Sequence, residues 1–156
     1  MPHGNLRVLQ AVQEAHLPKT QLAYMNITIQ SYSLERWDVF KQFARAPFCY
    51  RTGKKPFRDY LLDMARCKFV IAPRGAGLDT YRLWEALYLD CIPVVKTSSL
   101  DILYEDLPIL IVQDWKEVTE EFLNQKYEEF RRTPFNMEKT TLEYWTKWID
   151  SYKTFP

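Results

Sequence analysis

Residues 67–96, CKFVIAPRGAGLDTYRLWEALYLDCIPVVK, decide the fold. Two short runs within them, residues 68–72 and 92–96, are rich in Val and Ile and lack polar alternation, which is typical of strands buried on both faces of a parallel sheet. Between these runs the sequence predicts a glycine-containing turn at residues 73–77 and a helix over residues 79–89. The order of elements is that of a β-turn-α-β unit.

The helix of this unit has an apolar stripe at helical spacing, and Asp79 or Thr80 is placed to cap its N-terminus. Because a crossover helix makes both strands point the same way, the turn at residues 74–77 lies at the carboxyl edge of the sheet. Open α/β sheets bind their ligands at that edge. The turn is therefore the first candidate for a binding site.

The rest of the chain adds elements on both sides of this unit. Hydrophobic spacing predicts helices over residues 5–15, 34–45, 57–66, 115–132 and 138–152, and strands over residues 21–32 and 109–112. Residues 46–56, with two prolines and a glycine, predict a loop, and Asp114 is placed to cap the helix that follows it. A single Rossmann-like α/β domain, with about four strands and five or six helices in a parallel sheet flanked by helices, accounts for residues 1–156.

The last predicted helix carries two tryptophans, Trp145 and Trp148. Large aromatic residues are mostly buried, so we expect this helix to pack on the domain's own sheet. The alternative is that its aromatic face covers a protein partner.

Composition and charge limit the classes of partner. Apolar residues make up 47% of the chain and aromatic residues 15%, as in a folded globular protein. The formal net charge of +1, from 21 basic and 20 acidic residues, gives no electrostatic reason to expect nucleic acid or an anionic membrane. Any anion binding must therefore be local.

Two further features bear on compartment and metal binding. No apolar run approaches the roughly 20 residues that span a bilayer, and the first residues lack the apolar segment of a secretory signal. Three cysteines, Cys49, Cys67 and Cys91, lack metal-ligand spacing, so we expect packed free thiols and no metal site. The chain as it stands is expected in the cytoplasm.

The central turn has the features of an anion site. A helix N-terminus offers unpaired amides and the positive end of the helix dipole. Gly75 and Gly77 let a ligand approach the backbone closely, and the planar guanidinium of Arg74 suits phosphate oxygens. Together these features predict a diphosphate site, with a purely structural turn as the alternative.

Side chains of the helix and of the next strand extend this site. Arg82 and Glu85 are neighbours on one helical face, where Arg82 can contact phosphate and Glu85 can accept hydrogen bonds from vicinal sugar hydroxyls. The alternative for this pair is a surface ion pair. Asp79 is either a helix cap or a ligand contact. Lys96 and Ser98 form the neighbouring lip of the same edge, either as ligand contacts or as a solvated strand end.

Residues 69–115, FVIAPRGAGLDTYRLWEALYLDCIPVVKTSSLDILYEDLPILIVQDW, contain these features in a specific order. The string resembles the exostosin-like glycosyltransferases, specifically the C-terminal, donor-binding half of their two-Rossmann, GT-B type architecture. The matching positions are Pro73-Arg74-Gly75-x-Gly77, Asp79, Arg82, Glu85-Ala86, Cys91-Ile92-Pro93-Val94, Leu107-Pro108 and Asp114-Trp115.

The resemblance implies transfer of a hexosyl or pentosyl group from a nucleotide-sugar, usually a UDP-sugar, to a glycan or glycoprotein acceptor. It implies no metal and no other cofactor, because enzymes of this architecture stabilise the leaving diphosphate with protein cations and the helix dipole. We therefore expect the donor to contact the residues singled out above, which are Arg74, Gly75, Gly77, Asp79, Arg82, Glu85, Lys96 and Ser98.

The resemblance covers one of the two Rossmann domains. The N-terminal domain, which supplies the acceptor site and often the catalytic base, has no counterpart in the chain, so we expect a second domain or a protein partner to complete the enzyme. If the chain is a piece of a longer family member, the expected compartment is the Golgi lumen. The alternative is a non-catalytic fragment or pseudoenzyme that binds nucleotides or proteins.

No residue is assigned as the catalytic base. His3 lies at the terminus, and His16 lies at the end of the first predicted helix, where a cationic imidazole favours the helix dipole. Glu105 and Asp106 are adjacent acids that suit a solvated loop.

Overall fold

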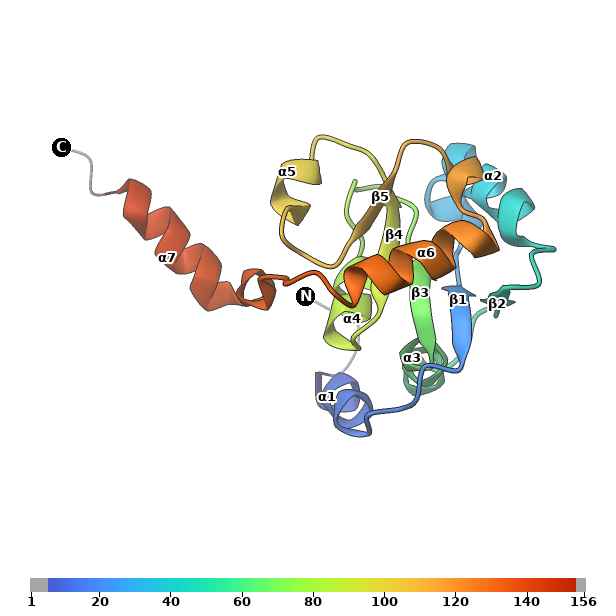
Figure 1. Cartoon of the computed structure of the whole chain (residues 1–156), viewed down its shortest axis with the longest axis horizontal. Coiled ribbons are helices and arrows are strands. Elements are labelled where there is room, and N and C mark those ends of the chain that lie inside the picture. The colour runs from blue at the N-terminus through green and yellow to red at the C-terminus, as the bar shows by residue number, and fades with distance from the viewer. Residues whose placement is uncertain (1–5, 154–156) are drawn as a thin grey trace.

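Five parallel strands form the sheet at the centre of the fold (Figure 1). The computed structural model describes residues 6–153. The strands are β1 (Gln21–Met25), β2 (Cys49–Arg51), β3 (Cys67–Ile71), β4 (Ile92–Lys96) and β5 (Leu110–Val112), in the spatial order β2-β1-β3-β4-β5. With its flanking helices, this sheet confirms the predicted Rossmann-like α/β fold.

The strand order reverses once. The chain goes from β1 outward to β2, returns to place β3 on the other side of β1, and then adds β4 and β5 in the same direction. In doubly wound sheets the gap between the carboxyl ends of the two strands at such a reversal is the topological switch point, where ligands bind. Here that gap lies between β1 and β3.

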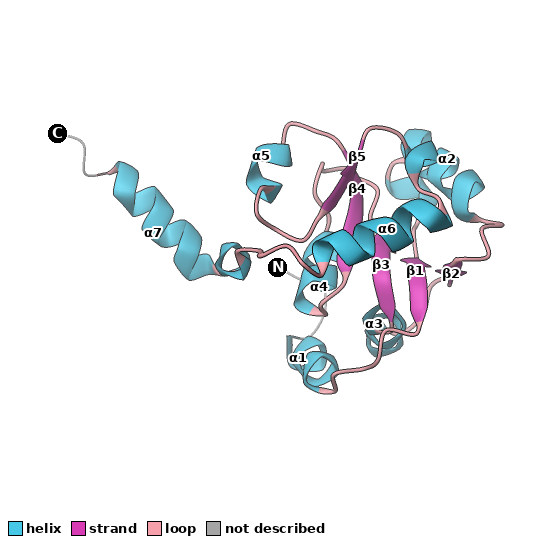
Figure 2. Cartoon of the chain, viewed as in Figure 1, coloured by secondary structure: helices cyan, strands magenta, loops and turns pink. Residues whose placement is uncertain are grey.

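Helices cover both faces of the sheet (Figure 2). Helices α1, α3 and α4 contact one another on one face, and α2 and α6 belong to the core on the other face. The helices are α1 (Leu6–Glu14), α2 (Ser33–Phe43), α3 (Phe57–Ala65), α4 (Tyr81–Tyr88), α5 (Asp101–Tyr104), α6 (Glu120–Phe130) and α7 (Leu142–Tyr152), with 3-10 turns η1 (Ile29–Ser31), η2 (Trp115–Glu117) and η3 (Met137–Thr140). Within residues 6–153, none of the helices has the length and apolar content to cross a membrane.

The central strand β3 shows why its sequence lacks polar alternation. Phe69 and Ile71 pack into the core beneath α2 and α6, whereas Val70 packs into the core shared with α1, α3 and α4. All three side chains are fully buried. Because both faces of the strand are covered, both sets of alternating side chains are apolar.

Two predicted boundaries near the N-terminal half were wrong. The strand expected over residues 21–32 ends at Met25, and residues 29–31 form the 3-10 turn η1. The loop expected over residues 46–56 contains the edge strand β2. That strand is three residues long and buries only Cys49, so it has no alternating apolar pattern to detect.

The helix expected over residues 115–132 is interrupted. Asp114 does cap a turn, because its side chain accepts from the Lys116 amide in a capping box with Glu117, but that turn is η2. Helix α6 then begins with its own cap, in which Thr119 Oγ1 accepts from the Phe122 amide at 3.2 Å.

The expectation that the last helix packs on the domain's own sheet was wrong. Helix α7 extends away from the sheet in Figure 1, and none of its residues is buried. Trp145 packs against Trp148 and donates from Nε1 to the carbonyl of Lys139 at 2.8 Å, so the helix is attached to η3. Other helices pack on both faces of the sheet.

Candidate functional site

The β3–α4 loop, residues 72–80, leaves the sheet at the carboxyl end of β3. It turns tightly, because the Gly75 amide donates to the carbonyl of Gly77 at 3.0 Å. A Cβ at Gly75 would lie 3.3 Å from Nη2 of Arg36, closer than most real contacts of this kind, whereas a Cβ at Gly77 would meet only ordinary contacts. Gly75 therefore allows an arginine to approach the loop.

A cavity of about 530 Å³ opens at the switch point, between the loop and the segments that follow β1. We call it the switch-point cavity. It brings together five of the eight residues expected from the sequence, which are Gly75, Gly77, Asp79, Arg82 and Glu85. Its other lining residues include Asn26, Thr28, Arg36, Phe57, Tyr60, Thr80 and Tyr81.

The N-terminus of α4 lies at this cavity and has no side-chain cap. Thr80 occupies the cap position with extended backbone, but its hydroxyl is buried and has no hydrogen-bond partner. Asp79 precedes the cap position, and its Oδ2 accepts from Nε1 of Trp84 at 3.2 Å. The hydroxyl of Thr80 therefore leaves the N-terminus of α4 without a side-chain cap, and helix N-termini are sites where anions bind.

Arg82, in the first turn of α4, lines the same cavity. Its Nε atom is buried and has no hydrogen-bond partner. A buried donor without an acceptor typically costs about 1–3 kcal/mol. Together with the Thr80 hydroxyl, it gives the cavity two buried polar atoms that a polar ligand could satisfy.

Glu85 follows one turn later and is 4% exposed. The hydroxyl of Tyr60, from α3, donates to its Oε2 at 2.9 Å. Burial raises the pKa of Tyr60 well above its ordinary value; the charge of Arg82 opposes this rise and the charge of Glu85 adds to it. Tyr60 thus stays protonated and holds the Glu85 carboxylate in place at the cavity.

Arg36, from α2, belongs to the cavity but was not identified from the sequence. It is 4% exposed and donates to three main-chain carbonyl oxygens, those of Arg74 at 2.7 Å, Thr28 at 2.9 Å and Pro73 at 3.3 Å. The guanidinium therefore joins the segment after β1 to the loop after β3, across the switch point.

The environment of Arg36 disfavours the positive charge of its guanidinium. Burial and, to a smaller extent, the nearby charge of Arg82 lower the pKa of Arg36 to about 10, while the charge of Glu35 opposes the change. Main-chain carbonyls do not neutralise a guanidinium, so Arg36 and Arg82 bring two positive charges to a cavity that the carboxylates of Asp79 and Glu85 also line. A sequence signal for Arg36 did exist: it lies three residues before Val39 and seven before Phe43, on the buried stripe of α2.

The other three expected residues, Arg74, Lys96 and Ser98, lie on the opposite side of the loop. They line a separate cavity of about 200 Å³, which we call the β4 cavity. The guanidinium of Arg74 stacks over the ring of Tyr32, with its central carbon 4.3 Å from the ring centroid. The structure therefore divides the expected set between two cavities.

Ser98 also has a structural role. Its hydroxyl accepts from the Leu100 amide at 3.2 Å, and its own amide donates to Oδ1 of Asp101 at 2.9 Å. Oδ2 of Asp101 accepts from the hydroxyl of Thr97 at 2.6 Å. These bonds fix the turn that leads from β4 into α5.

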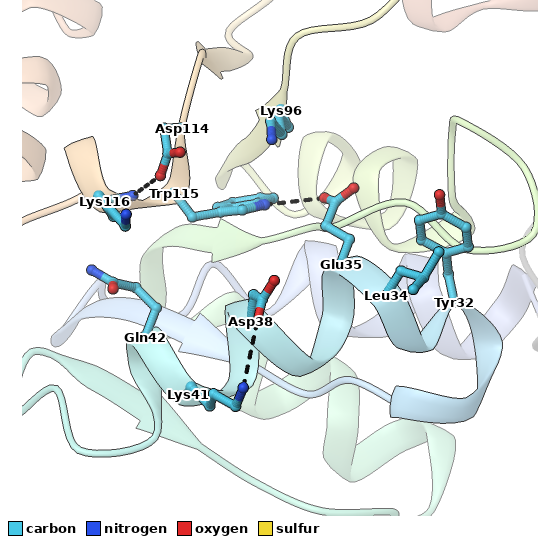
Figure 3. Close-up of a pocket in the computed structure, with 10 residues that line it drawn as sticks. All are labelled: Tyr32, Leu34, Glu35, Asp38, Lys41, Gln42, Lys96, Asp114, Trp115 and Lys116. Atoms are coloured by element: carbon cyan, nitrogen blue, oxygen red, sulfur yellow. Dashed lines mark hydrogen bonds and ion pairs between the residues drawn. The ribbon is translucent and has the colours of Figure 1, made fainter.

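A wider groove of about 710 Å³ adjoins the β4 cavity and shares Tyr32, Glu35 and Lys96 with it (Figure 3). We call it the outer groove. It runs between α2 and η2, and its wall includes Trp115 and Asp114. Both acidic and basic side chains line it.

The remaining acid-base candidates lie outside these cavities. Oδ2 of Asp106 lies 3.3 Å from Nζ of Lys139, and Glu105 is exposed in the same turn. His16 is exposed at the end of α1, and His3 lies outside the described residues. Within residues 6–153, no group of three or more His, Cys, Asp or Glu side chains is arranged to hold a metal ion.

Comparisons with known proteins do not assign the chain to a family. No protein-family model matches the sequence, and a search of curated proteins finds no significant match.

Proposed function

We propose that this domain binds the nucleotide-sugar donor of a glycosyltransferase, with a UDP-sugar as the donor class. The observation that supports the proposal most is the content of the switch-point cavity. The buried Arg36, the partly buried Arg82, the N-terminus of α4 and the carboxylate of Glu85 meet at the carboxyl edge of a parallel sheet. This combination suits a diphosphate next to a ribose.

In the proposed complex the diphosphate lies on the β3–α4 loop and the first turn of α4. Arg36 and Arg82 face its negative charge, and Glu85 accepts hydrogen bonds from the ribose hydroxyls. Phe57 and Tyr60 line the same cavity and offer aromatic surface to the base.

The proposed reaction in a complete enzyme is a displacement at the anomeric carbon of the sugar. An acceptor hydroxyl of a glycan or glycoprotein forms the new C–O bond, and the bond to the diphosphate breaks with its electron pair leaving on UDP. The two arginines and the helix dipole stabilise that leaving charge. A second domain or a protein partner supplies the acceptor site and the base.

Calorimetric titration of the domain with UDP tests the proposal. Saturable binding at or below millimolar nucleotide is expected, and Arg82→Ala and Glu85→Gln should each weaken it by about tenfold or more, because each removes a charge-assisted hydrogen bond. Arg131→Ala and Glu128→Gln are matched controls on the exposed surface of α6 and should leave binding unchanged. A folded domain that shows no saturable binding at millimolar UDP would refute the proposal.

A second function class is protein association without catalysis. The observation that favours it is α7, where Trp148 is 46% exposed and Ile149 49%. A labelled UDP-sugar with a glycan acceptor separates the two classes, because an association module produces no transfer even with a complementary domain present. The two function classes also differ in the expected compartment, which is the Golgi lumen for the transferase and the cytoplasm for a free-standing module.

A further inference from the structure

The β3–α4 loop separates two compartments with different chemistry. Gly75 and Gly77 line the switch-point cavity, whereas Arg74 and Leu78 line the β4 cavity. The loop is therefore a shared wall. A diphosphate bound on it has two substituents, and each side of the wall can hold one of them.

The lining of each compartment indicates which substituent it suits. The switch-point cavity contains three aromatic side chains and the carboxylate of Glu85, which fit a base and a ribose. The β4 cavity contains the charged side chains of Glu35, Arg74 and Lys96 and the hydroxyls of Thr97 and Ser98, beside the apolar side chains of Ala72, Leu78 and Val95. Charged and hydrogen-bonding groups of this kind suit the hydroxyls of a sugar.

Glu35 lies where the β4 cavity meets the outer groove, because it lines both. Its Oε1 accepts from Nε1 of Trp115 at 3.0 Å, as Figure 3 shows. Trp115 is itself buried and packs edge-on against Phe43, with ring centroids 6.2 Å apart. The buried indole of Trp115 therefore orients the carboxylate of Glu35.

The second oxygen of Glu35 is available to a ligand. Within residues 6–153, Oε2 has no hydrogen-bond partner, and no basic group forms an ion pair with this carboxylate. A carboxylate oxygen accepts up to two hydrogen bonds, so Oε2 can accept from neighbouring hydroxyls of one sugar ring.

We propose that Glu35 is the residue that recognises the transferred sugar, by accepting hydrogen bonds from its hydroxyls in the β4 cavity. Trp115 is the positioning residue, since it acts through Glu35. The inference rests on the proposed function, because the sugar reaches this cavity through the diphosphate on the loop. Since a carboxylate without its donor is left unpaired, sugars that lack the matching hydroxyls should bind less tightly.

Two indole N–H groups report separately on the two compartments. Nε1 of Trp84 donates to Asp79 beside the switch-point cavity, and Nε1 of Trp115 donates to Glu35 beside the β4 cavity. Each gives its own signal in a proton–nitrogen NMR spectrum of the labelled domain, which Trp→Phe variants assign. The titrants are UDP, UDP-glucose, UDP-galactose, UDP-N-acetylglucosamine and UDP-xylose.

UDP alone should shift the Trp84 signal and leave the Trp115 signal in place. At least one UDP-sugar should shift both and bind about tenfold or more tightly than UDP. Glu35→Gln keeps an oxygen that accepts from Trp115, so the fold is preserved, but it should abolish most of this gain while UDP affinity changes by less than about twofold. Asp38→Asn, a matched change on the outer groove in a side chain 3.6 Å from Lys41, should preserve the gain.

Three results would overturn the inference, and they are distinguishable. If Trp115 responds to UDP as strongly as to the sugars, the β4 cavity holds part of the nucleotide. If Trp84 responds to every titrant but Trp115 responds to none, the sugar lies elsewhere and the nucleotide site stands. If neither indole responds and calorimetry finds no binding, the proposed function fails and takes this inference with it.

Discussion

Helices α4 and α7 have similar amphipathic sequences and different environments. Helix α4 connects β3 to β4 and buries Leu83, Glu85, Ala86 and Leu87. Helix α7 follows η3 at the end of the chain and buries no residue. Apolar residues at helical spacing therefore identify the apolar face of a helix, but they do not show what covers that face. The rest of the fold decides whether a neighbouring element packs against it.

The largest expected effect comes from the titration of two buried thiols in the sheet, one on β2 and one on β3, whereas α7 carries no thiol. Burial raises the pKa of Cys49 from 9.0 to about 12, and that of Cys67 likewise to about 12. The unfolded chain releases these protons near pH 9 and the folded chain near pH 12, so their contribution to stability is full below pH 9 and is lost as the pH rises to 12. The loss is on the order of 4 kcal/mol for each thiol.

Urea unfolding between pH 8 and pH 11 measures this loss. The double variant Cys49→Ala, Cys67→Ala should lose stability less steeply than the parent over that interval. Helix α7 contributes no cysteine, so stopping the chain before it should leave the slope unchanged. Equal slopes for the parent and the double variant would contradict the expectation.

The next largest expected difference is in the free energy of unfolding, when one side chain is shortened to alanine in α4 and one in α7. Leu83→Ala in α4 removes a side chain that is 1% exposed and should lower the free energy of unfolding by about 2–5 kcal/mol, because it leaves a cavity in the core. Ile149→Ala in α7 removes a side chain that is half exposed and should change it by less than about 0.5 kcal/mol. Chemical denaturation of both variants compares the two, and similar losses would mean that α7 is covered in solution.

Removing the contacts that attach η3 to residues 105 and 106 should have an intermediate effect on the free energy of unfolding. Lys139 is 9% exposed, and its Nζ donates to the carbonyl of Glu105 and lies near the carboxylate of Asp106. Lys139→Met should cost about 1–3 kcal/mol, because it removes a partly buried, charge-assisted hydrogen bond to the carbonyl of Glu105. Lys147→Met, which breaks an exposed pair with Glu143, should cost less than about 0.5 kcal/mol. The amides of residues 105–107 should be less protected from hydrogen exchange in Lys139→Met than in Lys147→Met. Equal protection in the two variants would argue against an attachment through Lys139.

The smallest expected effect comes from removing α7. Ending the chain after Thr141 keeps the Lys139 contacts and the bond from the Tyr88 hydroxyl to the Thr140 carbonyl. The midpoint of thermal unfolding should therefore shift by no more than a few degrees, since less than about 1 kcal/mol is at stake. A much larger decrease would show that α7 supports the sheet.

The sequence predicted the elements whose apolar pattern is long enough to recognise. Residues 68–72 and 92–96 are continuous apolar runs, and the helix between them has a clear stripe, so the central unit was identified close to its observed bounds. β2 was missed because a three-residue edge strand has almost no pattern. Propensity describes local conformation, and pairing at a sheet edge is decided by the rest of the fold.

The candidate site was predictable only in part, for a geometric reason. Arg82 and Glu85 line the same cavity because residues three apart share a helical face. Arg74 and Gly75 are adjacent but line different cavities, because a turn has no fixed period that relates position to direction. Arg36 is distant in sequence and reaches the loop only through the folding of α2 against it.

The two unsatisfied atoms at the start of α4, the Thr80 hydroxyl and Nε of Arg82, have a consequence for the lifetime of the protein. Each lowers the stability of the domain by about 1–3 kcal/mol as long as it has no partner. A ligand that supplies acceptors for both removes that penalty, and the population of open, protease-sensitive molecules falls in proportion to ligand occupancy. Degradation of the protein would then be slowest when a ligand that satisfies both atoms is abundant, so the supply of that ligand would help to set the amount of the protein.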